Sequence, residues 1–318
     1  MTRKAALVAL LTGCLAACSP APPEESSPEK TSPLANGSFS AELGGFSIHY
    51  QVHGSGPVLM TVPNSWGLTL EGLRGLYRGL EEHFTLVYFD PRGMGQSGPI
   101  REETDMGKAA VRADFHALRR HLELDRVNVI GWSNGAMNLI LLASERPDTL
   151  SSAIFLHGVA RFSQQDMQNM AASHSELFQR YEAFQQEMNN EELSAAERDS
   201  RLKRFYLEEW FPHMLADPEA FRQRMAQAFD AARFGWRHSQ YANVDPPDPF
   251  DTSEDLRKIT ARSLVIAGRH DMLPPEKAQE IHDGIRDSTF FVFGRSGHFA
   301  PLEEPELFVE TVVDFLGS

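Results

Sequence analysis

Gly131-Trp132-Ser133-Asn134-Gly135 reads G-x-S-x-G and stands between two segments with different patterns. Residues 126–130 before it, which include Val127, Val129 and Ile130, predict a short strand, and residues 136–146 after it predict a helix that ends before a proline. On a sharp turn from strand to helix, a serine hydroxyl is pushed out of the sheet to where a base can reach it. The two glycines let the strand and the helix pack closely around the turn. The stretch therefore predicts that Ser133 is a nucleophile in a fold that joins strands to helices.

The composition is that of a folded protein with a sizeable core and an acidic surface. The chain has 318 residues, of which 42% are hydrophobic and 23% charged, and its formal net charge is −14 at pH 7. A nucleic-acid-binding face needs clustered basic residues, so this charge argues against a nucleic-acid partner. The chain has 12 histidines but no H-E-x-x-H motif, so the sequence predicts no metal site.

One glycine pattern, Gly93-x-Gly95-x-x-Gly98, follows a predicted strand and matches a dinucleotide-binding fingerprint. Such a site needs a helix directly after the glycines, because the helix N-terminus binds the pyrophosphate. Pro99 blocks that helix, and Asp90-Pro91-Arg92 fits a structural turn. We therefore expect no nucleotide cofactor, and the sequence indicates no other cofactor.

Residues 1–18 have the pattern of a secretory leader with a lipid attachment site. A basic start precedes the apolar residues 5–17, which are too few to span a bilayer as a mature helix. The stretch ends in Leu15-Ala16-Ala17-Cys18, which resembles the lipobox of bacterial lipoproteins. The resemblance implies that Cys18 is acylated and becomes the new N-terminus. A lipobox that ends at Cys14 would leave a shorter apolar core, and a plain secretory signal is the other alternative.

Both cysteines of the chain, Cys14 and Cys18, lie in this leader. The folded part therefore has no disulfide, no cysteine nucleophile and no cysteine-ligated zinc. Residues 19–38 are rich in Pro, Ser and Glu and predict a disordered, extended tether. The expected location is the bacterial cell envelope, with the protein anchored to a membrane through Cys18 on the periplasmic or outer face.

From Phe39 onward, strand and helix patterns alternate along the chain. Alternating or continuous apolar runs predict strands at residues 46–52, 58–62, 85–89, 127–130, 153–156, 264–267 and 289–293. Helical spacing is present at residues 70–82, 108–122, 134–146, 275–285 and 305–316. This alternation predicts an α/β fold built on a doubly wound, mostly parallel sheet with helices outside it.

One block interrupts the alternation. Residues 163–243 show no convincing strand pattern, are charged, and contain several methionines that more often fill a core than contact a substrate. A proline-rich break follows before the sheet pattern resumes. We therefore predict a core of residues 39–160 and 246–318, with an inserted all-helical cap at residues 161–245.

A nucleophilic serine needs a general base, and the base needs a carboxylate to orient it. In a doubly wound sheet these groups lie on loops at the carboxyl ends of strands. Asp271 and His298 lie on the loops that follow the last two predicted strands. We do not expect His270 to be the base, because neighbouring side chains in an extended loop, here His270 and Asp271, point apart. Another strand-end loop offers His157 but no carboxylate, so we do not expect the acid to come from it.

Four stretches resemble motifs of the α/β-hydrolase superfamily. They are the G-x-S-x-G turn, the D-x-R-G-x-G-x-S turn at residues 90–97, an acid loop at residues 264–275 and a histidine loop at residues 296–305. The chain order Ser133, Asp271, His298 also matches that of the family. The resemblance covers about residues 39–316, and its details are closest to the proline iminopeptidase-like branch with a helical cap.

The resemblance implies a role for each of the three residues. Ser133 Oγ would attack an acyl carbon, His298 would take its proton and pass it to the leaving group, and Asp271 would fix the tautomer of His298. One oxyanion donor would be the N–H of Asn134. The second would come from the loop at residues 63–67, where Ser65 N–H is preferred and Trp66 N–H is the alternative. That loop reads Pro-Asn where the family usually has His-Gly.

The sequence thus predicts a serine hydrolase that cleaves an ester or amide bond in a small substrate. An aminopeptidase should hold a substrate ammonium with acidic cap residues, and Glu208 and Glu209 are candidates, although a solvated helix face explains them more simply. A lipoprotein that keeps the fold as a non-catalytic binding module is the alternative from another class. An epoxide hydrolase or dehalogenase of the same fold would need aspartate in place of Ser133.

Overall fold

The computed structural model describes residues 34–242, 244–245 and 250–317. The predicted leader, Cys14, Cys18 and residues 19–33 of the predicted tether lie outside the described residues. The end of that predicted tether is corrected by the structure, because Gly37 and Ser38 already belong to the first strand, β1 (Gly37–Leu43). None of the helices within the described ranges is long and apolar enough to cross a membrane.

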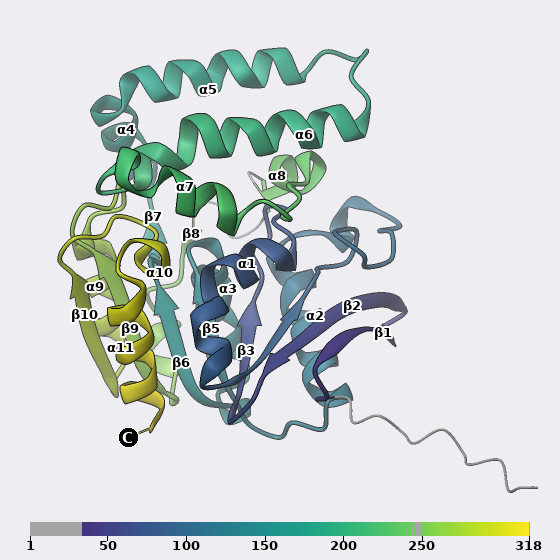
Figure 1. Cartoon of the computed structure of the whole chain (residues 1–318), viewed down its shortest axis with the longest axis vertical. Helices are drawn as coiled ribbons and strands as arrows, with labels where there is room; N and C mark the ends of the chain where they lie inside the picture. Colours follow the sequence, from purple (N-terminus) through teal and green to yellow (C-terminus); the bar gives the residue numbers. More distant parts are fainter. Residues whose placement is uncertain (1–33, 243, 246–249, 318) are drawn as a thin grey trace, which may run out of the picture. The chain divides into compact units, whose positions relative to one another are not determined.

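The core is an eight-stranded sheet with the order β1-β2-β4-β3-β5-β6-β9-β10 (Figure 1). After β1, its strands are β2 (Phe46–Gly54), β3 (Val58–Val62), β4 (Thr85–Phe89), β5 (Val127–Trp132), β6 (Leu150–Leu156), β9 (Arg262–Gly268) and β10 (Ser288–Phe293). β2 pairs antiparallel with both β1 and β4, and the other neighbours are parallel. The predicted α/β fold with a mostly parallel sheet is confirmed.

The inner parallel strands β3, β5, β6 and β9 are largely buried on both faces, which explains why their sequences are continuous apolar runs, whereas the edge strand β10 is only half-buried. Successive side chains of a strand point to opposite faces. Val129 accordingly packs into one hydrophobic cluster and Ile130 into the other. The missed strand, β1, has every second residue half-buried rather than a long apolar run, and it joins β2 through Gly44 and Gly45, whose φ angles are 60° and 84°.

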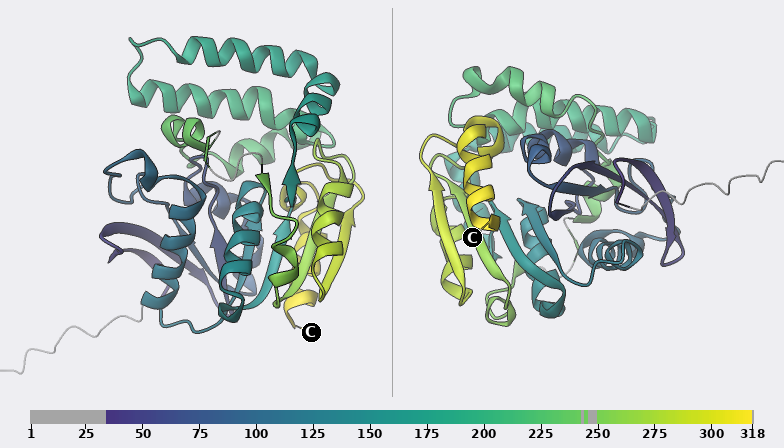
Figure 2. Two further views of the ribbon diagram at one scale, coloured as in Figure 1. Left: turned by 180° about the vertical axis from the view of Figure 1, so that it is seen from behind. Right: turned by 60° about the horizontal axis from the view of Figure 1, so that its bottom comes forward.

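Helices cover both faces of the sheet (Figures 1 and 2). One face is covered by α1 (Leu70–Tyr77) and α11 (Pro305–Gly317), whose apolar residues share a cluster. The other face is covered by α2 (Gly107–His121), α3 (Asn134–Glu145) and α9 (Pro275–Gly284). The shorter helical segments of the core are η1 (Arg78–Glu82), η2 (Glu103–Asp105), η3 (Pro147–Thr149), η6 (Leu256–Lys258) and α10 (Ala300–Glu303).

The cap is inserted after β6 and lies at the end of the sheet where the parallel strands finish (Figure 1). Its helical segments are α4 (Gln164–Ser173), α5 (Ser175–Met188), α6 (Ala195–Phe205), the π-helical turn η4 (Tyr206–Trp210), η5 (Phe211–Met214), α7 (Pro218–Ala228) and α8 (Trp236–Ala242). The expectation of an all-helical insertion needs one correction. Two short strands, β7 (Arg161–Phe162) and β8 (Phe250–Asp251), pair antiparallel where the insertion leaves and rejoins the core.

The D-x-R-G-x-G-x-S turn is a structural feature of the core. Asp90 is buried, and its carboxylate accepts the backbone N–H groups of Leu70, at the start of α1, and of Gln96. A Cβ on Gly95 would lie 1.9 Å from Asp90 Oδ2, so only glycine fits there. No helix follows Gly98 directly, and the next helical segment begins at Glu103.

Candidate active site

Ser133 lies between β5 and α3 with φ 54° and ψ −120°, a conformation that is strained for a residue with a side chain. Such strain costs on the order of 1–3 kcal/mol and persists only where the surroundings impose it. Here the N–H of Ser133 donates to Leu156 O at 2.8 Å. A Cβ on Gly131 would lie 2.5 Å from Gly135 O, and one on Gly135 would lie 2.5 Å from Val62 O. The two glycines therefore allow the close packing that this turn requires.

The sheet order brings four strand-end loops together. β5, β6, β9 and β10 are consecutive and parallel, so the loops that follow them lie at one edge of the sheet. These loops carry Ser133, His157, Asp271 and His298 in that order. The loop after β6 is also bonded to β9 through the backbone, because the N–H of His157 donates to Ile266 O at 2.8 Å.

Asp271 accepts three hydrogen bonds and is buried, with its side chain 2% exposed. Oδ2 lies 2.7 Å from His298 Nδ1 and 2.9 Å from His157 Nδ1, and Oδ1 accepts the N–H of Leu273 at 2.9 Å. Burial by itself would raise the pKa of Asp271. The positive charge that His298 can carry and the hydrogen bonds from the two histidines outweigh burial and lower this pKa to about 2. Asp271 is therefore a carboxylate at neutral pH.

The two histidines that bind Asp271 differ in the hydrogen bonding of their Nε2 atoms. His157 Nε2 accepts the N–H of Ala300 at 3.4 Å, so His157 carries its proton on Nδ1 and is neutral. His298 Nε2 is buried and has no hydrogen-bond partner among the described residues. Only His298 thus keeps a ring nitrogen that is available to a reacting group. His270 has an exposed side chain and lines a 360 Å³ cavity beside Asp271.

The backbone of His298 is held from two sides. The indole Nε1–H of Trp132, the residue before Ser133, donates to His298 O at 2.9 Å. The N–H of His298 donates to Met214 O of the cap at 2.7 Å. Gly297 permits this approach, because a Cβ there would lie 2.1 Å from Met214 O. The position of His298 therefore depends on both the strand end and the cap.

Glu303 connects the same loop to the cap through its buried carboxylate. Oε2 accepts the N–H groups of Gly297 and Phe299, on either side of His298, at 2.9 and 3.1 Å. Oε1 accepts the N–H of Ala216, which follows η5 of the cap, at 2.7 Å. Burial raises the pKa of Glu303, and these hydrogen bonds counteract that effect in part. Glu303 was not singled out from the sequence, because the pattern does not show which backbone groups it meets.

The expected oxyanion donors lie on either side of the elbow. Asn134 is the first residue of α3, so its N–H has no acceptor inside the helix. Ser65 N–H and Oγ–H both donate to the side-chain Oδ1 of Asn134, at 2.7 and 2.9 Å. Asn138 Nδ2 holds the same loop through Pro63 O at 3.0 Å. Ser65 N–H is therefore already occupied in this structure, and Trp66 N–H is the other expected donor of the loop.

A model of the α/β hydrolase fold family matches residues 62–305. The chain belongs to this family. A proline iminopeptidase of Clostridioides difficile (strain 630) is 25% identical over 282 residues, which cover 86% of this chain and 96% of that protein. A 2-hydroxy-6-oxo-6-phenylhexa-2,4-dienoate hydrolase of Comamonas testosteroni is 23% identical over 285 residues, which cover 86% and 93%. An α/β fold family hydrolase from Bacillus anthracis str. Sterne has the same fold, with a TM-score of 0.72 at 18% identity over 88% of this chain and 99% of that chain.

Membership of the α/β hydrolase family makes the chain an enzyme, and the alternative of a non-catalytic binding module loses its support.

His157, Asp271 and His298 are residues of the kinds that bind metal ions, and their potential ligand atoms lie within 4.8 Å of one another. However, both Nδ1 atoms face one oxygen of Asp271 at hydrogen-bond distances, and His157 Nε2 accepts the N–H of Ala300, so His298 Nε2 is the one ring nitrogen of this cluster without a hydrogen-bond partner among the described residues. The cluster fits the hydrogen-bonded acid and base of a hydrolase.

In this α/β hydrolase, aromatic side chains of the cap contact the loop at residues 63–67 and the turn that carries Ser133. The Trp66 ring stacks on Tyr206 at 5.0 Å between centroids and lies 5.7 Å from Phe234. Phe211 meets Trp132 edge to face at 6.3 Å. Trp132, Phe211 and Phe234 belong to one buried cluster that runs from the sheet into the cap, and the partly buried Trp66 and Tyr206 pack against it. The surroundings of the elbow on the cap side are therefore apolar and aromatic.

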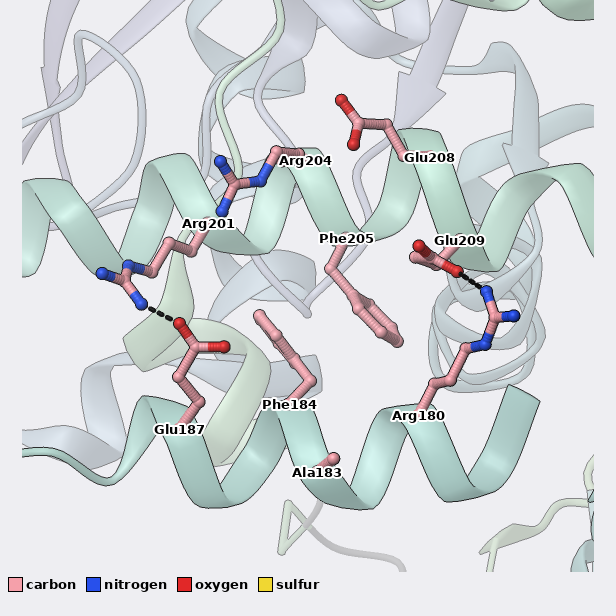
Figure 3. Close-up of a pocket in the computed structure, with 9 residues that line it drawn as sticks. All are labelled: Arg180, Ala183, Phe184, Glu187, Arg201, Arg204, Phe205, Glu208 and Glu209. Carbon is pink, nitrogen blue, oxygen red and sulfur yellow. Dashed lines mark hydrogen bonds and ion pairs between the residues drawn. The ribbon is translucent and has the colours of Figure 1, made fainter. Parts of the chain in front are cut away.

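Glu208 and Glu209, the expected anchors for a substrate ammonium, lie in a 310 Å³ pocket of the cap (Figure 3). All nine residues that line this pocket belong to α5, α6 and η4. Glu209 pairs with Arg180 at 2.5 Å, and Glu208 is exposed. No residue of the hydrolase core lines this pocket, so the structure does not bring these two carboxylates together with Ser133.

Proposed function

We propose that this α/β hydrolase cleaves an ester or amide bond in a small substrate through an acyl-enzyme on Ser133. The observation that carries the proposal is the arrangement around His298. Its Nδ1 is bound to the ionised Asp271, while its buried Nε2 has no partner among the residues described. This is the state that a general base needs before it takes a proton from a neighbouring serine.

The steps follow from these roles. Ser133 Oγ attacks the acyl carbon while its proton moves to His298 Nε2, and Asp271 stabilises the charged ring. The proton then passes to the departing alcohol or amine. A water molecule then attacks the acyl carbon while His298 takes its proton, and His298 returns that proton to Ser133 Oγ as the acid leaves. Asn134 N–H, with Ser65 N–H or Trp66 N–H, would stabilise the oxyanion, and one such donor contributes about 10²–10³-fold in rate.

The proposal is tested by covalent labelling and turnover. A fluorophosphonate probe should label the wild-type protein at one site, and the label should disappear in Ser133→Ala. Hydrolysis of short p-nitrophenyl esters should fall to the background rate in the same variant. Labelling that persists in Ser133→Ala, or its absence from the wild type, would exclude Ser133 as the nucleophile.

An aminopeptidase that removes N-terminal proline is a second candidate, because proline iminopeptidases align with most of the chain. The position of Glu208 and Glu209 in a pocket formed by the cap alone does not favour it. A panel of proline and alanine arylamides against p-nitrophenyl esters separates the two activities. Arylamide rates at background level, with esters turned over, would remove the peptidase.

We also propose that Cys18 anchors the enzyme to a membrane of the bacterial cell envelope. The support is the lipobox-like stretch at residues 15–18 and the basic, apolar leader before it. Incorporation of labelled palmitate should be lost in Cys18→Ala and kept in Cys14→Ala. The reverse result would move the processing site to Cys14, and no incorporation in the wild type would indicate a plain secretory signal.

A further inference from the structure

We infer that His157 is a positioning residue of this hydrolase, which holds Asp271 and shares with His298 the same carboxylate oxygen. The inference rests on the proposed function, because it concerns the acid of the proposed Ser133–His298–Asp271 triad. Its basis is geometric. His157 Nδ1 and His298 Nδ1 lie 2.9 and 2.7 Å from Asp271 Oδ2, and the side chain of His157 is 0% exposed.

The backbone of His157 is built for this contact. Its φ angle is 53°, in the left-handed region that residues other than glycine seldom adopt. The N–H of His157 donates to Ile266 O of β9, and its Nε2 accepts the N–H of Ala300. These bonds point Nδ1–H at Asp271 and leave His157 no free nitrogen with which to act as a base. A strained conformation that is held by three hydrogen bonds indicates a constraint beyond simple packing.

The sharing of Oδ2 has a chemical consequence. A carboxylate oxygen that accepts two N–H donors places less of its charge on each of them. His157 therefore moderates the stabilisation that Asp271 gives to protonated His298, and it keeps the carboxylate of Asp271 oriented. The ionisable groups that face this cluster are Asp271 after β9, His298 after β10 and Glu303 of α10, which interacts with Asp271. Burial lowers the pKa of His157, which favours a neutral donor.

Asn and Leu make a matched pair of substitutions for His157. They are similar in size, but Asn carries an N–H donor near the position of Nδ1 and tolerates positive φ, whereas Leu has no donor. We expect His157→Leu to move the acidic limb of kcat/KM for a p-nitrophenyl ester to higher pH, because protonated His298 gains more of the Asp271 charge. The loss at about pH 6 should then exceed the loss at about pH 8 by about 3- to 10-fold. His157→Asn should keep the acidic limb of the wild type.

The inference would be overturned if kcat/KM of His157→Leu were lower than that of the wild type by the same factor at every pH, because a merely structural role lowers the rate in that way. A shifted acidic limb in His157→Asn as well would also overturn it. Failure of the proposed function is seen separately, as absence of Ser133-dependent labelling in the wild type.

A measurement on the unmodified site keeps the inference testable if His157→Leu does not fold. With ¹⁵N-labelled histidine, the ring signals of His157 in the wild type should show the neutral Nδ1–H form from about pH 5 to about pH 8. Both the His157 and the His298 Nδ1–H signals should move in Asp271→Asn. A His157 ring that titrates in this range, carries its proton on Nε2, or is unaffected by Asp271→Asn would overturn the inference.

Discussion

Trp132 Nε1 donates a hydrogen bond to the carbonyl oxygen of His298 over 2.9 Å. The residue before the proposed nucleophile thus holds the residue that is proposed to activate it. The two rings are also in contact, with centroids 5.4 Å apart. Because Trp132 belongs to β5 and His298 follows β10, this bond links two strands that are not neighbours in the sheet.

Trp132→Phe should lower kcat by about 10-fold, since a misplaced base is less often in line with Ser133. The ring would still fill most of the site, so the free energy of unfolding should fall by only about 1–3 kcal/mol. Ester turnover and urea unfolding measure the two effects. Trp236→Phe, in α8 of the cap, is the matched control, and an equal loss of kcat there would point to a general effect of losing an indole.

Asp271→Asn should lower kcat by about 10³–10⁴-fold while the protein stays folded, because an amide cannot stabilise a protonated His298 and favours the wrong tautomer. The measurement is ester turnover together with the melting temperature. Asp283→Asn, in α9 away from the cluster, serves as the control for the loss of one charge. Near-normal turnover in Asp271→Asn would show that another carboxylate orients the base.

The stability of the protein should depend on the ionisation of Asp271 at acidic pH. Folding lowers the pKa of Asp271 from 3.8 to about 2. Its ionised form therefore stabilises the folded protein fully when the pH is above the pKa of the unfolded state, and this stabilisation is lost as the pH falls through the pKa of the folded state. The wild type should therefore have a larger free energy of unfolding than Asp271→Asn at about pH 4, and this difference should shrink towards about pH 2. Urea titrations across this range test it, and an excess that does not change with pH would contradict it.

Asn134→Ala should raise kcat/KM for esters by up to about 10-fold. In the structure Asn134 Oδ1 accepts a hydrogen bond from Ser65 N–H. This bond must be broken, at a cost of about 1–2 kcal/mol, before Ser65 N–H can donate to an oxyanion. Asn138→Ala is the comparison, because it removes the bond to Pro63 O and should lower the rate by loosening the loop. A fall in Asn134→Ala instead would mean that its side chain braces the loop and that Trp66 N–H is the second donor.

Glu303→Gln should reduce the free energy of unfolding by about 1–3 kcal/mol and should lower kcat. The amide presents its own N–H₂ to backbone donors, so either the N–H of Ala216 or those of Gly297 and Phe299 lose their acceptor. Thermal unfolding and ester turnover measure the change. Glu306→Gln, on the exposed side of α11, controls for the lost charge. An unchanged melting temperature would show that Glu303 does not join the cap to the histidine loop.

Much of the fold was predictable because doubly buried strands leave a local signal. The predicted strands at residues 58–62 and 85–89 coincide with β3 and β4, and most predicted helices differ from the observed ones by a residue or two at their ends. β1 was missed because a half-exposed edge strand needs no continuous apolar run. The pairing of β7 with β8 joins segments about ninety residues apart, and two-residue strands have no periodicity to read.

The sequence alone determined that strands end shortly before Ser133, Asp271 and His298, because each follows a short apolar run and the G-x-S-x-G turn needs its glycines. Only the tertiary structure decided which of these loops meet. The order β5-β6-β9-β10 places His157 on Asp271, although their loops are more than a hundred residues apart. The helices of the cap hold Glu208 and Glu209 in a pocket of their own, and the pairing of β3 with β5 sets Asn134 against Ser65. Such contacts depend on strand order and on the docking of the cap, and local periodicity carries no information on either.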